Sequence, residues 1–295
     1  MIWFPDADEP PPPGTFGKRG RKPAPISETA GLSHRAWLEP VRGVLFASGL
    51  TLNDLVDRSG FSKTRISELL RGNGYYPAWE ITFSVIRALG LPIQPMRRLW
   101  TAAAREAQKE PDWIKGCIQQ VALQPEHPPL AHQAFTEAMD AAYTDYARAF
   151  LLTDHRARWV VAETFDILWL CWNEAAASEN IRRYAWRLLR SRVMARAHRH
   201  HDGHPDLRAA VFSTAEVHDD GPGQFVIRSE LVDLFDAIGQ LPHDQMDVAV
   251  LHYLCAMSLE EIPEILGLSP AITHAVDHHA RATLERLLRS HSPRE

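Results

Sequence analysis

The segment from residue 51 to residue 72, TLNDLVDRSGFSKTRISELLRG, constrains the fold of this chain more than any other. Thr51 can cap the start of a short helix, and Gly60 can adopt the positive φ angle that a tight turn requires. Ser62 can cap a second helix, in which apolar residues recur every three or four positions. The pattern predicts two short helices joined by a sharp turn.

The rest of the chain has the same helical periodicity. It contains no long stretch in which apolar and polar residues alternate, and no internal repeat of the roughly 33 to 47 residues that is typical of helical solenoids. Its 295 residues leave room for about two or three domains. We therefore expect an all-α protein that is not a solenoid.

Composition suggests how this chain is divided. The first 30 residues contain seven prolines and few large apolar side chains, so they bury too little surface to offset the entropy of ordering. The expected parts are a disordered tail at 1–33, a five-helix helix-turn-helix domain at 34–109, a helical domain at 130–202, a linker at 203–227 and a domain with a second helix-turn-helix at 228–290.

Charge is unevenly distributed, although the whole chain has a net charge of −5. Residues 34–109 contain eleven basic and six acidic side chains, a net of +5. Residues 130–180 contain three basic and eight acidic side chains, residues 181–201 contain seven arginines and no acid, and residues 229–289 contain three basic and ten acidic side chains. Because binding to a phosphate backbone needs local positive potential, 34–109 and 181–201 are the candidate segments for such contacts.

The turn glycine, serine cap, buried isoleucine and closing Arg-Gly of GFSKTRISELLRG resemble the XRE (Cro and repressor-like) helix-turn-helix family. The resemblance covers about residues 35–105 and includes a preceding helix and following helices at 78–89 and 94–108. Val56 departs from it, because the family usually has alanine there. The resemblance implies a homodimer whose second helix enters the major groove of double-stranded DNA. It assigns base contacts to Lys63, Thr64 and Ser67 and backbone contacts to Arg65 and Arg71. Ser62, the helix cap, is also among the predicted DNA-binding residues.

The alternative interpretation of this first pair of helices is a bundle with a glycine turn that contacts no DNA. Such pairs are common in helical proteins. The match in register over more than twenty residues and the net charge of +5 around it favour DNA binding.

A second pair of short helices is predicted near the other end, within residues 251–288. Ser258 and Glu261 can form a capping box, and Gly267 can make the turn. Ser269 and Pro270 can begin a long helix. The apolar positions expected to face inward on that helix are Ile272, Val276, Ala280, Leu284 and Leu287.

Residues 251–288, with the apolar helix before them, resemble region four of sigma factors, and residues 133–200 are similar to region two of the extracytoplasmic-function class. The resemblance implies an acidic helical face for RNA polymerase core, with Glu163 and Asp166 on it, and a base-capturing loop at 173–180. It also implies a basic helix that holds duplex DNA through Arg182, Arg183, Arg187 and Arg190. A tryptophan at helical spacing is more often part of a core than a base platform. We expect at least two of Trp159, Trp169, Trp172 and Trp186 to be buried.

Two departures from the sigma pattern stand in the last segment. The outward positions of the long helix carry few cations, with Arg281 and Arg286 opposed by Asp277 and Glu285, so we expect weak DNA binding there. Pro263 occupies a position where the family usually has alanine. We therefore expect a sequence-specific DNA-binding regulator whose sigma-like part contacts RNA polymerase, another protein or itself. The alternatives are a functional sigma factor of that class and a regulator with a helical sensor for a small molecule or peptide.

Other classes of protein find little support in the sequence. Three widely spaced cysteines argue against a disulfide framework, and no apolar run approaches the length of a membrane span. His198, His200, His201 and His204, with Asp202, have no regular spacing, so we expect no metal and no cofactor. The chain has no phosphate-binding glycine loop, nucleophile elbow or HExxH motif, so we do not expect an enzyme. A cytoplasmic, nucleoid-associated protein without a membrane partner fits best.

Overall fold

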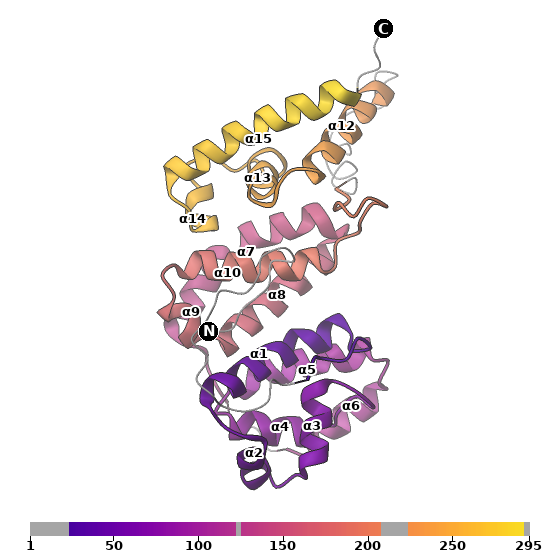
Figure 1. Cartoon of the computed structure of the whole chain (residues 1–295), viewed down its shortest axis with the longest axis vertical. Helices are drawn as coiled ribbons and strands as arrows, with labels where there is room; N and C mark the ends of the chain where they lie inside the picture. Colours follow the sequence, from indigo (N-terminus) through magenta and orange to yellow (C-terminus); the bar gives the residue numbers. More distant parts are fainter. Residues whose placement is uncertain (1–23, 122–124, 208–223, 292–295) are drawn as a thin grey trace. The chain divides into compact units, whose positions relative to one another are not determined.

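The computed structural model describes residues 24–121, 125–207 and 224–291, and this part of the chain is helical, without a strand (Figure 1). The only extended pairing among these residues is an isolated antiparallel bridge between Arg199 and Pro205. The all-α prediction is thereby confirmed. None of the helices in the described ranges has the length and apolar character needed to cross a membrane.

The chain folds into two compact units. Unit 1 comprises residues 1–133 and 163–177, and unit 2 comprises residues 134–162 and 178–295. The boundary that follows residue 133 therefore lies near the start of α7 (Leu130–Leu151). The boundary that follows residue 162 lies inside α8 (Asp154–Leu170). The domain bounds expected from the sequence remain predictions.

Unit 1 is built around three tryptophans. Trp37, Trp79 and Trp100 are fully buried, and α1 packs on α5 while α2 packs on α4. The helices expected at 78–89 and 94–108 are present as α4 and α5. The helices of this unit besides parts of α7 and α8 are α1 (Leu32–Ser48), α2 (Leu52–Ser59), α3 (Lys63–Arg71), α4 (Trp79–Ala88), α5 (Ile93–Glu106), α6 (Pro111–Gln119) and α9 (Trp172–Ala177).

The described end of the expected tail is packed against the first helices. The backbone N–H of Ser27 donates to the carbonyl of Arg71 at 2.8 Å, and Arg42 donates to the carbonyl of Ala24 at 2.6 Å. Ala30 is buried. Residues 24–31 therefore contact the first helices of unit 1. Residues 1–23 of that prediction lie outside the described residues.

Unit 2 has an aromatic core in which Tyr143, Tyr146, Phe150 and Trp186 are buried. The rings of Tyr146 and Trp186 meet edge to face with their centroids 4.5 Å apart, a favoured arrangement of aromatic pairs. The remaining helices of this unit are α10 (Ile181–Met194), α12 (Gln224–Gly239), α13 (His243–Ala249), the π-helical η1 (Val250–Leu254), α14 (Ile262–Leu266) and α15 (Pro270–His291).

The inward face of α15 differs from the one expected. Its buried residues are Thr273, Asp277, Ala280 and Leu284, whereas Ile272 is 51% exposed. Ala280 and Leu284 were predicted correctly. The placement of Ile272 was wrong because the buried stripe begins one residue later, at a threonine whose hydroxyl donates to the carbonyl of Ser269.

The expected loop at 173–180 is also largely helical, because α9 continues to Ala177. Alanine is the best helix former, and the run of three alanines in this segment extends the helix. Three of the four tryptophans, Trp169, Trp172 and Trp186, are buried, whereas Trp159 is exposed. The prediction that at least two of them belong to the core is therefore confirmed.

Candidate nucleic-acid interface

The turn between α2 and α3 is fixed by local hydrogen bonds. Thr51 and Asp54 form a reciprocal capping box, in which the hydroxyl of Thr51 accepts from the Asp54 N–H and the Asp54 carboxylate accepts from the Thr51 N–H. The Asp54 carboxylate accepts from both the N–H and the hydroxyl of Thr51, and these two hydrogen bonds lower the pKa of the Asp54 carboxyl. Gly60 has a φ of 75° and ends α2, and the Ser62 hydroxyl accepts from Arg65 N–H at the start of α3. The predicted helix ends and turn are present.

Helix α3 has a buried face and an exposed polar face. Ile66 is fully buried, and Leu69 and Leu70 are buried beside it, so the helix is held to unit 1 by its apolar side. The opposite side presents the predicted base-contacting residues to solvent. Ser62, Lys63, Thr64, Arg65, Glu68 and Arg71 are exposed, and Ser67 is half-buried.

Arg65 is positioned by an aromatic neighbour. Its guanidinium lies 5.5 Å from the centroid of the Phe61 ring, within cation–π range. Phe61 belongs to the turn, so this contact links the turn to the first turn of α3. Arg65 remains exposed and keeps its hydrogen-bond donors available at the edge of the polar face.

An aromatic group beside α3 did not emerge from the sequence. A cavity there is lined by Arg65, Tyr75 and Trp113, among others. Tyr75 is 94% exposed, and the ammonium of Lys109 lies 5.9 Å from its ring and 5.6 Å from the ring of Trp113. Exposed aromatic faces with a neighbouring cation can stack on bases or pack on sugars. Tyr75 lies three residues after the end of the 51–72 segment, so its position in the sequence could have suggested it, whereas Trp113 belongs to α6, far along the chain.

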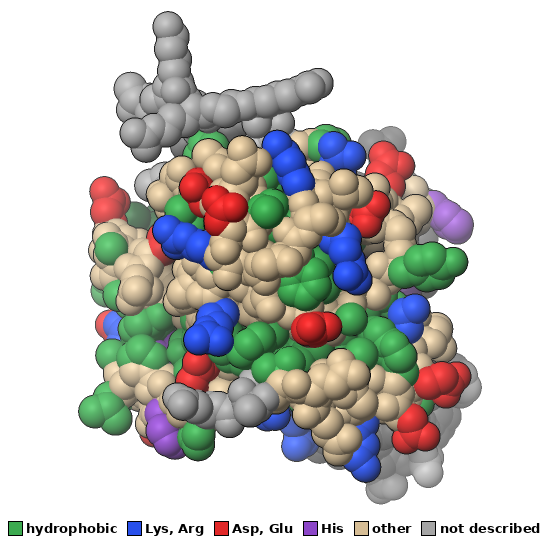
Figure 2. Space-filling model, turned by 90° about the horizontal axis from the view of Figure 1, so that it is seen from below, with side chains coloured by type: hydrophobic (Ala, Val, Ile, Leu, Met, Phe, Trp, Pro, Cys, Tyr) green, Lys and Arg blue, Asp and Glu red, His purple; other side chains and the backbone are tan. Residues whose placement is uncertain are grey.

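Positive charge is not gathered into one broad patch on the surface in view. Figure 2 shows Lys and Arg side chains in separate places, with Asp, Glu and hydrophobic side chains between them. A face with separate cations would neutralise few phosphates at a time.

The arginines expected to hold duplex DNA from α10 are mostly paired within unit 2. Arg182 forms an ion pair with Glu264, and Arg183 forms one with Asp244 at 3.2 Å. Arg190 is buried and donates to Asp247 at 3.0 Å. For Arg190 the prediction of a DNA contact is corrected, because its charge is compensated inside the protein. Arg187 is the exposed member of the four.

The expected polymerase-facing carboxylates lie mostly inside unit 1. Glu163 is buried at 4% exposure. Asp166 accepts hydrogen bonds from Nε of Arg98 at 3.0 Å and from its Nη2 at 2.5 Å, and Arg98 also lies over the Trp169 ring. Burial raises the pKa of the Asp166 carboxyl, and the Arg98 guanidinium partly offsets that effect. The two residues do not form an exposed acidic face, which corrects that expectation.

The second predicted turn is present with its capping box. The Ser258 N–H donates to the Glu261 carboxylate at 2.9 Å, and the Glu261 N–H donates to the Ser258 hydroxyl at 3.3 Å. Gly267 ends α14 with a φ of 65°. On α15, the buried Asp277 pairs with Arg281 at 2.9 Å. This pair places a negative charge beside one of the few cations of α15.

A scan against protein-family models and searches of curated proteins and of solved structures found no match to this chain. The geometry of α2 and α3, together with the sequence pattern that predicted it, is therefore the basis for a functional proposal.

Proposed function

We propose that the protein is a sequence-specific DNA-binding regulator of transcription, and that unit 1 reads double-stranded DNA with the start of α3. The observation that carries this proposal is the polar face of α3. Ile66, Leu69 and Leu70 hold the helix from behind. Lys63 and Thr64 stand exposed at its first turn, next to a sharp turn that lets the helix project. Such a helix fits the major groove with its first residues against base edges.

The side chains of this face suit the chemistry of a base edge. A lysine such as Lys63 donates to the O6 and N7 atoms of guanine, and hydroxyls such as those of Thr64 and Ser67 donate or accept. The methyl group of threonine can also contact the methyl group of thymine. Arg65 and Arg71 stand at the two ends of the helix, where guanidinium groups can bind phosphates and fix the register.

Unit 2 has a different proposed role. Three of the four arginines that would make α10 a DNA-binding helix pair with Glu264, Asp244 and Asp247. We therefore assign DNA reading to unit 1 and propose that unit 2 contacts RNA polymerase, another protein or a second copy of the chain. Promoter-dependent transcripts made by core polymerase with this protein alone would instead support a functional sigma factor.

The test begins with selection of duplexes from a random library by the full-length protein at low salt. Fluorescence anisotropy on the selected duplex then compares the wild type with Lys63→Ala and Ser67→Ala. Each good base contact contributes about 1 to 3 kcal/mol, so each variant should bind about 10-fold to 100-fold more weakly. Lys115→Ala removes an exposed lysine of α6 and serves as the matched control.

Two results would overturn the proposal. One is a folded wild-type protein that enriches no duplex and binds none at low salt. The other is selection of a duplex whose affinity is the same for the wild type, Lys63→Ala and Ser67→Ala, because the reading face would then lie elsewhere. Circular dichroism of each variant establishes that the fold is retained.

A further inference from the structure

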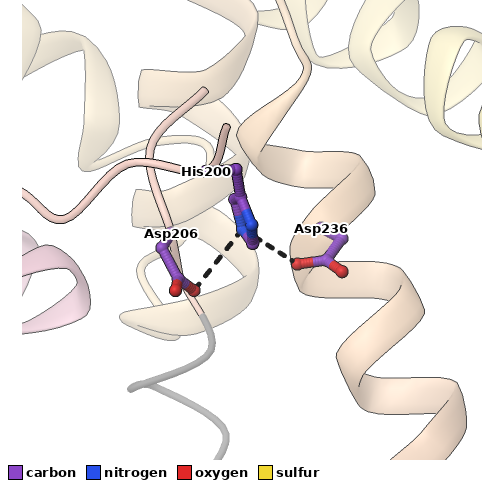
Figure 3. Close-up of side chains that lie close together, drawn as sticks. All are labelled: His200, Asp206 and Asp236. Atoms are coloured by element: carbon purple, nitrogen blue, oxygen red, sulfur yellow. Dashed lines mark ion pairs between the residues drawn. The ribbon is translucent and has the colours of Figure 1, made fainter. Parts of the chain in front are cut away.

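Unit 2 contains a group of three metal-ligating side chains that lie far apart in the sequence. His200 and Asp206 belong to the turn that follows α10, and Asp236 belongs to α12. The Nε2 atom of His200 lies 3.5 Å from a carboxylate oxygen of Asp206 and 3.3 Å from one of Asp236 (Figure 3). One ligand atom from each residue lies within 4.8 Å of the others, and all three residues are half-buried.

The backbone around this group is held in place on both sides. The Asp206 N–H donates to the His198 carbonyl at 2.8 Å, and the His200 N–H donates to the His204 carbonyl at 2.9 Å. Gly239 ends α12 where a Cβ atom would lie 2.6 Å from the carbonyl oxygen of Pro205. The turn therefore approaches the end of α12 closely, and the ligand atoms come from two elements with fixed backbones.

The two spacings from His200 Nε2 match those between neighbouring ligands of a tetrahedral metal ion. Zinc binds histidine nitrogen and carboxylate oxygen at about 2.0 to 2.2 Å, which sets neighbouring ligand atoms about 3.4 Å apart. The two distances from His200 Nε2 lie on either side of that value. We propose that His200, Asp206 and Asp236 form a binding site for a divalent transition-metal ion of the zinc class, with a water molecule as fourth ligand.

Charge supports a cation at this position. Two carboxylates that approach the same imidazole repel one another, and an ion between them removes that repulsion. With neutral His200, a divalent ion compensates both negative charges. The bound ion would fasten Asp236 of α12 to the turn at 200–206, so its effect would be on the stability of unit 2. The inference does not depend on DNA binding by unit 1.

A protonated His200 that pairs with both carboxylates is the competing explanation. The metal site and the ion pair depend on pH in opposite ways, because metal binding requires a neutral imidazole whereas the ion pair requires a charged one. Measurements at pH 8 therefore favour the metal.

The experiment uses tag-free full-length protein that has been treated with a chelator and dialysed. Cobalt(II) is titrated at pH 8 and its visible absorption is followed, and zinc is then added to displace it. We expect one equivalent of cobalt per chain, displaced by zinc. Asp236→Asn and His200→Gln should each weaken binding by at least about tenfold. His201→Ala, which removes an exposed histidine of the same turn, should leave affinity unchanged.

The melting temperature provides a second readout. Zinc should raise that of the wild type and of His201→Ala at pH 8, but not that of Asp236→Asn, because an ion that binds only the folded state stabilises it. The absence of saturable cobalt binding would overturn the proposal. So would binding that is lost in His201→Ala but kept in Asp236→Asn, since that result identifies chelation by surface histidines. If Asp236→Asn fails to fold, Asp206→Asn takes its place under the same expectations.

Discussion

Arg190 of α10 donates from Nε to the Oδ1 atom of Asp247 in α13 at 3.0 Å, and both side chains are almost completely buried. Asp247 also accepts hydrogen bonds from the Tyr146 hydroxyl at 2.7 Å and from Trp186 Nε1 at 2.9 Å. The carboxylate is thus shared by donors from two other helices. A residue that looked like a phosphate contact in a basic helix instead helps to join α7, α10 and α13.

Asp247→Ala should destabilise unit 2 by about 3 to 5 kcal/mol, because it breaks the buried ion pair with Arg190 and removes the acceptor of the Tyr146 hydroxyl and of Trp186 Nε1. The measurement is the free energy of unfolding from urea denaturation. Asp244→Ala is the matched control, since Asp244 pairs with Arg183 at a position where its side chain is 60% exposed. That surface pair should be worth less than about 1 kcal/mol. Equal losses in the two variants would contradict this assignment.

Gly267→Ala should destabilise unit 2 more than a positive φ alone explains. An added Cβ would lie 2.5 Å from the backbone nitrogen of Arg183 and 2.8 Å from Oδ1 of Asn180, which caps α10. Gly60→Ala is the control, because Gly60 has a similar φ and nothing within 4 Å of an added Cβ. We expect a loss of about 1 to 2 kcal/mol for Gly60→Ala. Gly267→Ala should lose about 1 to 3 kcal/mol beyond that, from overpacking. Similar losses in thermal or urea unfolding would show that the backbone contact is relieved easily.

Local chemistry explains which parts of the structure the sequence could predict. Thr51, Gly60 and Ser62 determine the ends of α2 and α3 through hydrogen bonds and φ angles within a few residues, and both helices lie where those signals place them. The capping box of Ser258 and Glu261 is another such signal, and it was also predicted correctly. These features need no knowledge of the tertiary fold.

Long-range pairing explains what the sequence could not predict. The sequence around Arg190 does not indicate that its side chain will be buried in an ion pair with Asp247. The sequence around His200 does not indicate that a carboxylate oxygen of Asp236 will lie 3.3 Å from its Nε2 atom. The prediction of the buried face of α15 was partly wrong for a related reason. A helix with apolar residues on several sides offers more than one inward stripe, and only packing against α12 and α13 selects the one that contains Thr273.

Arg71→Ala should reduce the salt dependence of DNA binding without changing the preferred sequence. Each phosphate neutralised by a cation contributes about 0.9 to the slope of log K against log salt, so removal of one contact should lower that slope by about 1. Anisotropy titrations of the full-length protein at several salt concentrations measure it. Arg87→Ala removes an exposed arginine of α4 and should keep the wild-type slope. An unchanged slope in Arg71→Ala would show that this side chain contacts no phosphate.

His34 makes the stability of unit 1 depend on pH. It is buried between Trp37, on which it stacks with centroids 4.9 Å apart, and Tyr76. Burial lowers the pKa of His34 from 6.5 to about 4, with Glu106 opposing that shift and Arg35 adding to it. Below pH 6.5 the unfolded chain binds a proton that the folded chain does not, so this contribution to stability is present above pH 6.5 and is lost as the pH falls towards 4. The loss should reach about 3 kcal/mol.

His34→Phe should flatten this pH dependence, because phenylalanine fills a similar ring-shaped space and does not titrate. The Nε2 atom of His34 is buried and has no hydrogen-bond partner in the described part of the chain, so no bond of that atom is lost. Hydrogen exchange of α1 amides, corrected for the intrinsic exchange rate, reports the opening of unit 1 separately from unit 2. Between pH 7 and pH 4.5, the wild type should lose more protection than His34→Phe. His127→Gln, which changes an exposed histidine of the same unit, should follow the wild type. Parallel pH curves for the wild type and His34→Phe would show that His34 is not the titrating group.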